Sequence, residues 1–233
     1  KDGWIDRLAG ELFHRAFSAM ANQPSVVTLS VNISPVQLRL PSLPINIQAI
    51  AEAAGFSPNR LTIEITENAL TEGLDQARTI LAAYKAIGCK LALDDFGTGY
   101  SSLVRLQSLP FDEIKVDRSF VESMAERRDS RKIVATVVGL GQSLGLITVA
   151  EGVETLEQAQ MLQWLGCDLA QGWFYGKAVP AKDLPDAVSG FRPKERPTMS
   201  IDAVGRVSRG SLDPLPSVRL AQLQAVYDGA PVG

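Results

Sequence analysis

Strand-like and helix-like segments alternate through the first 185 residues of the chain, and this alternation leaves few folds open. Short runs rich in β-branched and apolar residues are each followed by a helical pattern, and several of these patterns end at a glycine, as at Gly55 and Gly145. Such alternation predicts an α/β fold with a parallel sheet. A helix is expected over residues 4–21, and strands are expected at residues 25–32, 61–66, 90–95, 112–117, 146–151 and 168–175.

A polar residue closes the apolar run in five of the six expected strands, and the sixth carries a glutamine. In chain order these residues are Asn32, Glu64, Asp94 with Asp95, Lys115, Glu151 and Gln171. In a βα-barrel the carboxyl ends of all strands converge on one face. An open doubly wound sheet would spread them along a crevice, and no glycine-rich phosphate loop follows the first strand. The sequence therefore predicts a βα-barrel with these side chains around one mouth.

The side chains expected at the mouth favour a site for hard divalent cations. Several carboxylates gathered there would repel one another without a cation, and oxygen-only ligation suits magnesium or manganese. The only histidine is His14, on an early helix, which argues against a histidine-based zinc or iron site. Adjacent Asp94 and Asp95 could bridge two ions, an arrangement that activates water for displacement at phosphorus. Lys115 adds a positive charge that could orient a hydroxide or neutralise developing negative charge.

Each of these residues also has an ordinary structural interpretation when it is taken alone. Glu64 could be a surface carboxylate, and Asp94 and Asp95 could mark a turn. Lys115 could be a surface lysine, and Gln171 could simply hydrogen-bond at a strand end. Only the position that they share in the repeat favours the joint interpretation.

Six sequence blocks, taken in order, resemble the motifs of EAL domains. They are Val31-Asn32-Ile33-Ser34 with Gln37, Glu64-Ile65-Thr66-Glu67, DDFGTGYSSL at 94–103, KVDRSFV at 115–121, VAEGVET at 149–155, and Gln171-Gly172 with Gly176. The resemblance extends from about residue 4 to residue 185, and its DDFGTGYSSL and AEGVET strings are highly specific.

This resemblance implies a modified TIM (βα)8 barrel that hydrolyses cyclic di-GMP to linear pGpG with two Mg²⁺ or Mn²⁺ ions. By position, the implied metal ligands are Asn32, Glu64, Asp94, Asp95 and Glu151. The implied catalytic residues are Lys115, which positions the nucleophilic water, together with Glu151 and Gln171. The implied substrate-binding residues are Gln37, Asp117 and Gln171.

The same resemblance implies a regulatory loop and several partners. Gly97, Thr98 and Gly99 lie in a loop that the family ties to metal occupancy and dimerisation, and Glu154 matches a residue that anchors this loop. The two glycines would permit unusual backbone angles in a moving segment. The expected partners are cyclic di-GMP, a second copy in a homodimer, and PAS-like sensor or diguanylate cyclase domains of the same full-length chain. The expected location is the cytoplasm, including the cytoplasmic side of a membrane-anchored protein.

The sequence departs from the family pattern in two places. The Glu-Ala-Leu motif, which the family carries on a strand ahead of its first helix, does not occur here. Its glutamate is a metal ligand in the family, and about two of the eight barrel strands are expected upstream of residue 1. The alternative function is therefore a non-catalytic cyclic di-GMP receptor. In the second departure, Trp173, Phe174, Tyr175 and Lys177 keep the aromatic and cationic character expected beside a guanine and its phosphate.

The last part of the chain differs in composition from the rest. The expected division is an EAL domain over residues 1–185 and a linker rich in proline, glycine and serine over residues 186–217. Residues 218–233 are expected to form an amphipathic helix, and this segment looks like the opening of a PAS-like sensor domain. A net charge of −3 without a basic stripe argues against binding to long nucleic acid.

Overall fold

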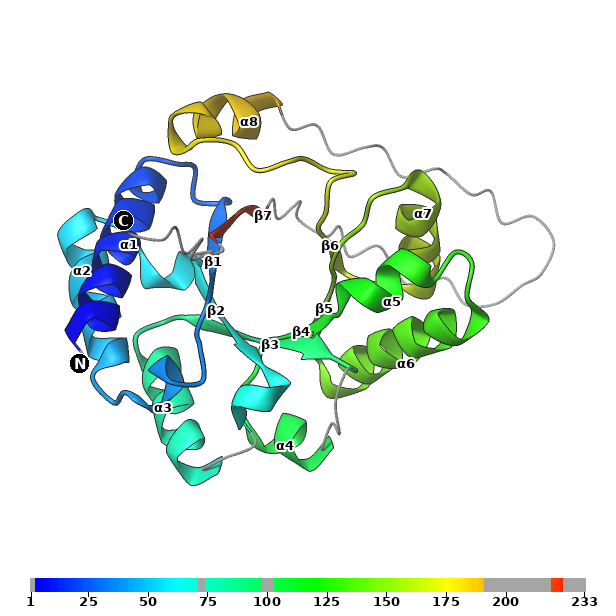
Figure 1. Ribbon diagram of the computed structural model, residues 1–233, viewed down its shortest axis with the longest axis horizontal. Coiled ribbons are helices and arrows are strands. Elements are labelled where there is room, and N and C mark those ends of the chain that lie inside the picture. Colours follow the sequence, from blue (N-terminus) through cyan, green and yellow to red (C-terminus); the bar gives the residue numbers. More distant parts are fainter. Residues whose placement is uncertain (1–2, 71–73, 98–102, 191–218, 224–233) are drawn as a thin grey trace, which may run out of the picture.

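The computed structural model describes residues 3–70, 74–97, 103–190 and 219–223, and its centre is a parallel sheet that curls around an axis (Figure 1). Neighbouring strands pair in parallel in the order β6-β5-β4-β3-β2-β1-β7. The six expected strands are confirmed. They are β1 (Thr28–Asn32), β2 (Leu61–Thr66), β3 (Lys90–Phe96), β4 (Glu113–Val116), β5 (Ile147–Ala150) and β6 (Leu169–Ala170).

Helices cover the outer side of this sheet (Figure 1), and their ends follow from local sequence. Gly55, Gly145 and Gly166 adopt left-handed conformations that end α2, α6 and α7, while Thr155 and Gln158 form a capping box that begins α7. No helix in the described part of the chain is long and apolar enough to cross a membrane. The helices are α1 (Gly3–Ala21), α2 (Leu43–Ala54), α3 (Leu74–Ala86), α4 (Leu103–Ser108), α5 (Arg118–Ser123), α6 (Arg128–Leu144), α7 (Leu156–Leu165) and α8 (Leu184–Gly190), with short 3-10 turns at Gln37–Arg39, Pro58–Arg60, Glu67–Leu70 and Ala181–Asp183.

The contact between α6 and the sheet shows which side chains of β4 face the inside of the barrel. Gly141 of α6 lies so close to the sheet that a Cβ atom there would stand 2.2 Å from Cγ2 of Thr148 and 3.2 Å from Cγ2 of Ile114. Ile114 of β4 therefore faces the helix layer. Because successive side chains of a strand point to opposite faces, Lys115 faces the inside of the barrel.

The sixth strand is shorter than the expected 168–175 because the chain turns after Gln171. The amide of Tyr175 donates to the carbonyl of Gly172 at 3.0 Å. Gly172 has a φ of 154°, and a Cβ atom there would lie 2.2 Å from the carbonyl oxygen of Val153. This close approach bends the segment away from the sheet.

Two expectations for the C-terminal part of the chain are corrected. The linker expected from residue 186 begins later, because α8 continues to Gly190. The helix expected over residues 218–233 is wrong for Arg219–Leu223, which form strand β7 in parallel pairing with β1. The register sets Ala221 beside Leu29 and Leu223 beside Val31. The backbone groups of β1 that face away from β2 are open to such pairing, and this long-range partner overrides the helical periodicity of the segment. Residues 191–218 and 224–233, with the rest of the linker and the PAS-like segment, lie outside the described residues.

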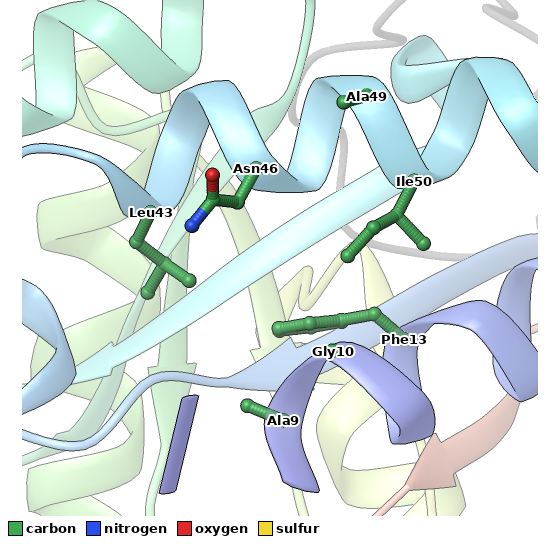
Figure 2. Close-up of a pocket in the computed structure, with 7 residues that line it drawn as sticks. All are labelled: Ala9, Gly10, Phe13, Leu43, Asn46, Ala49 and Ile50. Carbon is green, nitrogen blue, oxygen red and sulfur yellow. The ribbon is translucent and has the colours of Figure 1, made fainter. Parts of the chain in front are cut away.

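A cavity of about 220 Å³ lies between α1 and α2 (Figure 2). Apart from Asn46, its lining is apolar or glycine: Ala9, Gly10, Phe13, Leu43, Ala49 and Ile50. None of the residues that line this cavity is one of the polar residues at the strand ends.

Candidate functional site

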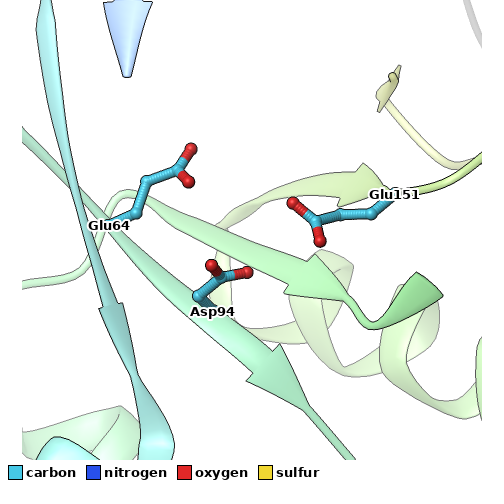
Figure 3. Close-up of side chains that lie close together, drawn as sticks. All are labelled: Glu64, Asp94 and Glu151. Carbon is cyan, nitrogen blue, oxygen red and sulfur yellow. The ribbon is translucent and has the colours of Figure 1, made fainter. Parts of the chain in front are cut away.

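Three carboxylates from different parts of the sheet meet where the sequence places the mouth of the barrel. Glu64 lies on β2, Asp94 lies on β3, and Glu151 directly follows β5. Each contributes an oxygen atom that lies within 4.8 Å of the other two, and Figure 3 shows the side chains directed toward one another. Glu64 and Asp94 are only 1% and 5% exposed. Charges of one sign at this spacing repel strongly away from water, so the cluster requires a cation.

Lys115 supplies a positive charge to all three carboxylates. Its Nζ atom lies 2.5 Å from Glu64 Oε2, 2.5 Å from Glu151 Oε1 and 3.1 Å from Asp94 Oδ1. The side chain is fully buried. Burial alone would lower the pKa of Lys115, but the charges of Glu64, Glu151 and Asp94 outweigh burial and raise the pKa above its ordinary value. Lys115 therefore stays protonated and acts as the counter-charge of the cluster.

Glu151 holds its proton at higher pH than an ordinary glutamate. Burial raises the pKa of Glu151 to about 7, with further contributions from Asp94 and Glu64, although the neighbouring Lys115 charge acts in the opposite direction. Its Oε1 atom also accepts a hydrogen bond of 2.7 Å from Nε2 of Gln171. The backbone amide of Gln171 donates to the carbonyl of Ala150 at 2.8 Å, which ties this glutamine to the end of β5. Gln171 therefore orients Glu151.

Asp95 faces a different neighbour from Asp94. Its φ of 56° is left-handed, and its amide donates to Asp94 Oδ1 at 3.0 Å. The side chain of Asp95 hydrogen-bonds with Asp117, and burial together with the charges of Asp94 and Asp117 raises the pKa of Asp95. Asp117 caps the start of α5 by accepting hydrogen bonds from the amide and hydroxyl of Ser119. The roles of Asp95 in metal binding and of Asp117 in substrate binding stay predictions.

Asn32 and Gln37 lie at the carboxyl end of β1 and beyond it. Asn32 pairs in register with Glu64, which places it beside the carboxylate cluster. Gln37 begins the 3-10 turn after β1, and its Oε1 atom accepts hydrogen bonds from the amide and the hydroxyl of Ser34 at 3.0 and 2.9 Å. These contacts organise the loop after β1. The ligand role of Asn32 and the substrate role of Gln37 stay predictions.

The residues expected to regulate the site are only partly described. Gly97 has a φ of 102° and lies against Phe120 of α5, whereas Thr98 and Gly99 lie outside the described residues. Glu154 accepts a hydrogen bond of 2.9 Å from Nη2 of Arg118. The sequence assigned no role to Arg118. The available indication was its positive charge directly after Asp117, close to the end of the strand that carries Lys115. The role of Glu154 as a loop anchor stays a prediction.

The donor set fits a hard divalent cation. Carboxylate oxygens of Glu64, Asp94 and Glu151 are within reach of one shared ion, and the cluster contains no nitrogen or sulfur ligand of the kind that softer metals prefer. Asp95 and Asp117 form a second carboxyl pair next to the cluster, joined to it through Asp94. The structure thus offers a buried oxygen site with further carboxylates beside it.

Metal affinity is expected to rise with pH through neutrality. Glu151 has a pKa of about 7 in the metal-free protein and must lose its proton before it can bind a cation, so affinity should rise up to about tenfold per unit below pH 7 and then level off. Without metal, the same raised pKa favours the folded state at acidic pH, and this contribution is lost as pH rises through 7. Calorimetric titration with Mn²⁺ at pH 6, 7 and 8 measures the metal affinity. A constant affinity over this range would contradict it.

Comparison with known proteins identifies relatives along most of the chain. The family model described as EAL domain matches residues 1–178. An uncharacterised signalling protein of Caulobacter vibrioides is 42% identical over 184 residues, which are 79% of this chain and 23% of that protein. The cyclic di-GMP phosphodiesterase RocR of Pseudomonas aeruginosa is 38% identical over 191 residues, which cover 80% of this chain and 48% of RocR. The chain spans between 21% and 48% of the length of the first curated relatives that it matches.

Solved structures share the fold. The PaMucR phosphodiesterase in complex with c-di-GMP has a TM-score of 0.74 and 34% sequence identity, covering 78% of this chain and 75% of that one. A manganese and cyclic di-GMP complex of Klebsiella pneumoniae BlrP1 has a TM-score of 0.69 and 36% identity, covering 76% of this chain and 46% of that one. The curled parallel sheet is accordingly part of a TIM-type barrel, as the alternation of strands and helices predicts. The chain belongs to the EAL domain family.

Proposed function

We propose that this chain carries the catalytic residues of a phosphodiesterase that hydrolyses cyclic di-GMP to linear pGpG. The observation that carries the proposal is the contact of Lys115 with Glu64, Asp94 and Glu151, since a surface role would not require a lysine and two of these carboxylates, Glu64 and Asp94, to be buried. The proposal is supported by relatives named as cyclic di-GMP phosphodiesterases, including RocR.

A divalent cation would be held by Glu64, Asp94 and Glu151, with Asn32 and Asp95 next to them. When bound, such an ion polarises the phosphoryl group and lowers the pKa of a bound water. We propose Mg²⁺ or Mn²⁺, as two ions, because the adjacent pair Asp94 and Asp95 could serve both. Metal use is supported by the calcium and manganese complexes of BlrP1 with cyclic di-GMP.

Lys115, Glu151 and Gln171 would act on the attacking water and on its surroundings. Lys115 would donate hydrogen bonds to the attacking water and keep a positive charge beside the phosphate oxygens as negative charge develops. Glu151, deprotonated when it holds the ion, would accept a hydrogen bond from that water and keep it oriented. Gln171 would keep Glu151 oriented through the hydrogen bond to Oε1.

The direct test is incubation of cyclic di-GMP with Mg²⁺ or Mn²⁺ and chromatographic detection of pGpG. It is made on this chain and on a chain extended by the upstream strands that the family resemblance implies. Production of pGpG that stops when the metal is chelated is expected. Saturable nucleotide binding without pGpG from either chain would favour the receptor alternative, and the absence of both would contradict the proposal.

The remaining expectations about the whole protein are also proposals. We propose a homodimer in the cytoplasm whose full-length chain joins this domain to a sensor domain, with a diguanylate cyclase domain as a further partner. The sensor and cyclase domains are supported by relatives that are longer than this chain, among them the oxygen sensor protein DosP of Escherichia coli and the bifunctional MucR of Pseudomonas aeruginosa. The homodimer and the cytoplasmic location rest on the family resemblance alone.

A further inference from the structure

The segment that follows Glu151 is held by helix α5 as well as by the sheet. Glu151 lies one residue beyond β5, and its amide donates to the carbonyl of Val116 on β4 at 3.2 Å. The next residue, Gly152, has a left-handed φ of 69°, which turns the chain out of the strand direction. The direction of the Glu151 side chain therefore depends on what holds residues 152–155.

Gln158 forms a buried connection between this segment and α5. The residue is only 5% exposed. Its Oε1 atom accepts hydrogen bonds from the amides of Glu154 and Thr155 at 2.8 and 3.0 Å, and its Nε2 atom donates to the carbonyl of Glu122 in α5 at 3.2 Å. A glutamate could also accept the first two bonds, at the start of α7. The third bond needs the amide group of a glutamine, so helix capping does not account for it.

Arg118 joins the same segment to α5 at the surface. Its Nη2 atom donates to Glu154 Oε1 at 2.9 Å, and its Nε atom bonds to Glu122 of its own helix. The arginine stem also covers Gly152, because a Cβ atom there would lie 2.2 Å from Cγ of Arg118. Gln158 and Arg118, here called the α5 clamp, thus hold the segment on its buried side and on its exposed side.

The α5 clamp encloses the ion pair of Lys115 and Glu151 between two sets of contacts. Lys115 lies on β4, which leads through the N-cap residue Asp117 into α5. Glu151 follows β5, which leads into the segment that the clamp holds. The two partners of the 2.5 Å contact are therefore joined within the sheet and again beyond the strand ends. A shift of the segment relative to α5 would move Glu151 within the carboxylate cluster.

We propose that Gln158 and Arg118 are positioning residues for Glu151, which keep its carboxylate placed to bind a cation with the rest of the carboxylate cluster. This inference rests on the proposed function only in taking Glu151 as a metal ligand. Residues that orient a ligand from outside the coordination sphere change metal affinity about 10- to 100-fold when they are replaced. Gln158 is expected to contribute more than Arg118, because solvent screens the exposed ion pair.

Replacing Gln158 by glutamate tests the buried side of the clamp. The change keeps the acceptor at the start of α7 and removes the donor to Glu122. Gln158→Glu is expected to weaken Mn²⁺ binding about tenfold or more, measured by calorimetric titration at pH 8. The matched control is Gln142→Glu, because Nε2 of Gln142 also donates to a backbone carbonyl of another element, that of Gly166 at 3.1 Å. This control should keep the Mn²⁺ affinity of the unaltered protein.

Arg118→Met tests the exposed side of the clamp. Methionine keeps apolar cover over Gly152 but removes the charge bonded to Glu154. Mn²⁺ affinity should fall about threefold, and Arg118→Lys should retain part of it. The matched control is Arg15→Met on α1, which removes an arginine whose Nε atom lies 2.8 Å from Glu11, four residues away. It should leave the Mn²⁺ affinity unchanged.

The direction of the expected change separates positioning from charge. Gln158→Glu adds a negative charge, and Arg118→Met removes a positive one. By charge alone, either variant would bind Mn²⁺ more tightly than the unaltered protein. A purely structural role would lower the folded fraction and leave the affinity of the folded protein as it was. Weaker binding by folded protein therefore indicates that Glu151 has moved.

The outcomes are decided separately from the proposed function, because titration with Mn²⁺ needs no nucleotide. Unchanged or tighter binding in Gln158→Glu, or an equal loss in Gln142→Glu, would overturn the inference. If Gln158→Glu does not fold, as judged by circular dichroism, the comparison of Arg118→Met with Arg15→Met decides. Mn²⁺ binding without pGpG, in the unaltered chain and in its upstream-extended form, would overturn the proposed function and leave this inference standing. Absence of Mn²⁺ binding in both forms would overturn the inference.

Discussion

Replacing Lys115 by methionine is expected to destabilise the metal-free protein by about 3–5 kcal/mol and to reduce turnover of cyclic di-GMP roughly 10²- to 10⁴-fold. Lys115 lies within 3.1 Å of Glu64, Asp94 and Glu151, so its removal leaves two buried carboxyl groups and the partly buried Glu151 facing one another. The expected loss of stability follows from these contacts. The expected loss of turnover follows from the proposed role of the ammonium group at the attacking water. Urea unfolding with and without Mn²⁺ measures the first, and initial rates measure the second.

Divalent metal should return part of the stability but not the activity of the Lys115→Met variant. A bound cation supplies the missing positive charge to the carboxylates, whereas it does not replace the ammonium donor. Lys85→Met is the matched control, because Lys85 forms an ion pair of 2.7 Å with Asp112 at the opposite end of the sheet and its side chain is 36% exposed. This control should lose at most about 1 kcal/mol and keep its turnover. Full activity in Lys115→Met would contradict the assignment of Lys115.

Replacing Asp94 by asparagine is expected to weaken binding of Mn²⁺ by roughly 100-fold or more and to remove most of the turnover. The change keeps the shape of the side chain but removes one of the three negative charges that meet within 4.8 Å. Calorimetric titration with Mn²⁺ measures the affinity, and pGpG formation at saturating metal separates lost binding from lost catalysis.

The control for this variant is Asp112→Asn, which makes the same chemical change at the amino end of β4. Asp112 accepts hydrogen bonds from Lys85 and from the amide of Leu91, so this variant should lose stability without losing metal affinity. Equal Mn²⁺ affinity in Asp94→Asn and in the unaltered protein would show that the carboxylate cluster does not bind the cation. The test is independent of whether cyclic di-GMP is the substrate.

Local sequence was sufficient for most of the secondary structure. β-branched runs such as Leu61–Thr66 and helix ends such as Gly145 depend on backbone preferences that act within a few residues. The polar residue at the end of each run was also readable, because the carboxyl ends of parallel strands share one face of the barrel. Fold class and the neighbourhood of Glu64, Asp94, Lys115 and Glu151 therefore followed from spacing alone.

Contacts between distant segments were not readable in this way. The helical prediction for Arg219–Leu223 was wrong because these residues pair with the edge of β1, about 190 residues earlier in the chain. Local periodicity carries no information about such long-range backbone hydrogen bonds. The shortened β6 likewise depends on the close approach of Gly172 to Val153. In both places tertiary packing outweighed a weak local preference.

The amino-acid sequence by itself determined that this chain forms a parallel barrel sheet with acidic side chains and one lysine at its carboxyl edge. Only the tertiary structure decided how they pair: Lys115 contacts three carboxylates, Gln171 orients Glu151, and Asp95 turns toward Asp117. The physical reason is that the two properties depend on interactions of different range along the chain. Strand periodicity specifies the face on which a side chain lies, whereas distances between charges depend on how separate strands twist and pack together.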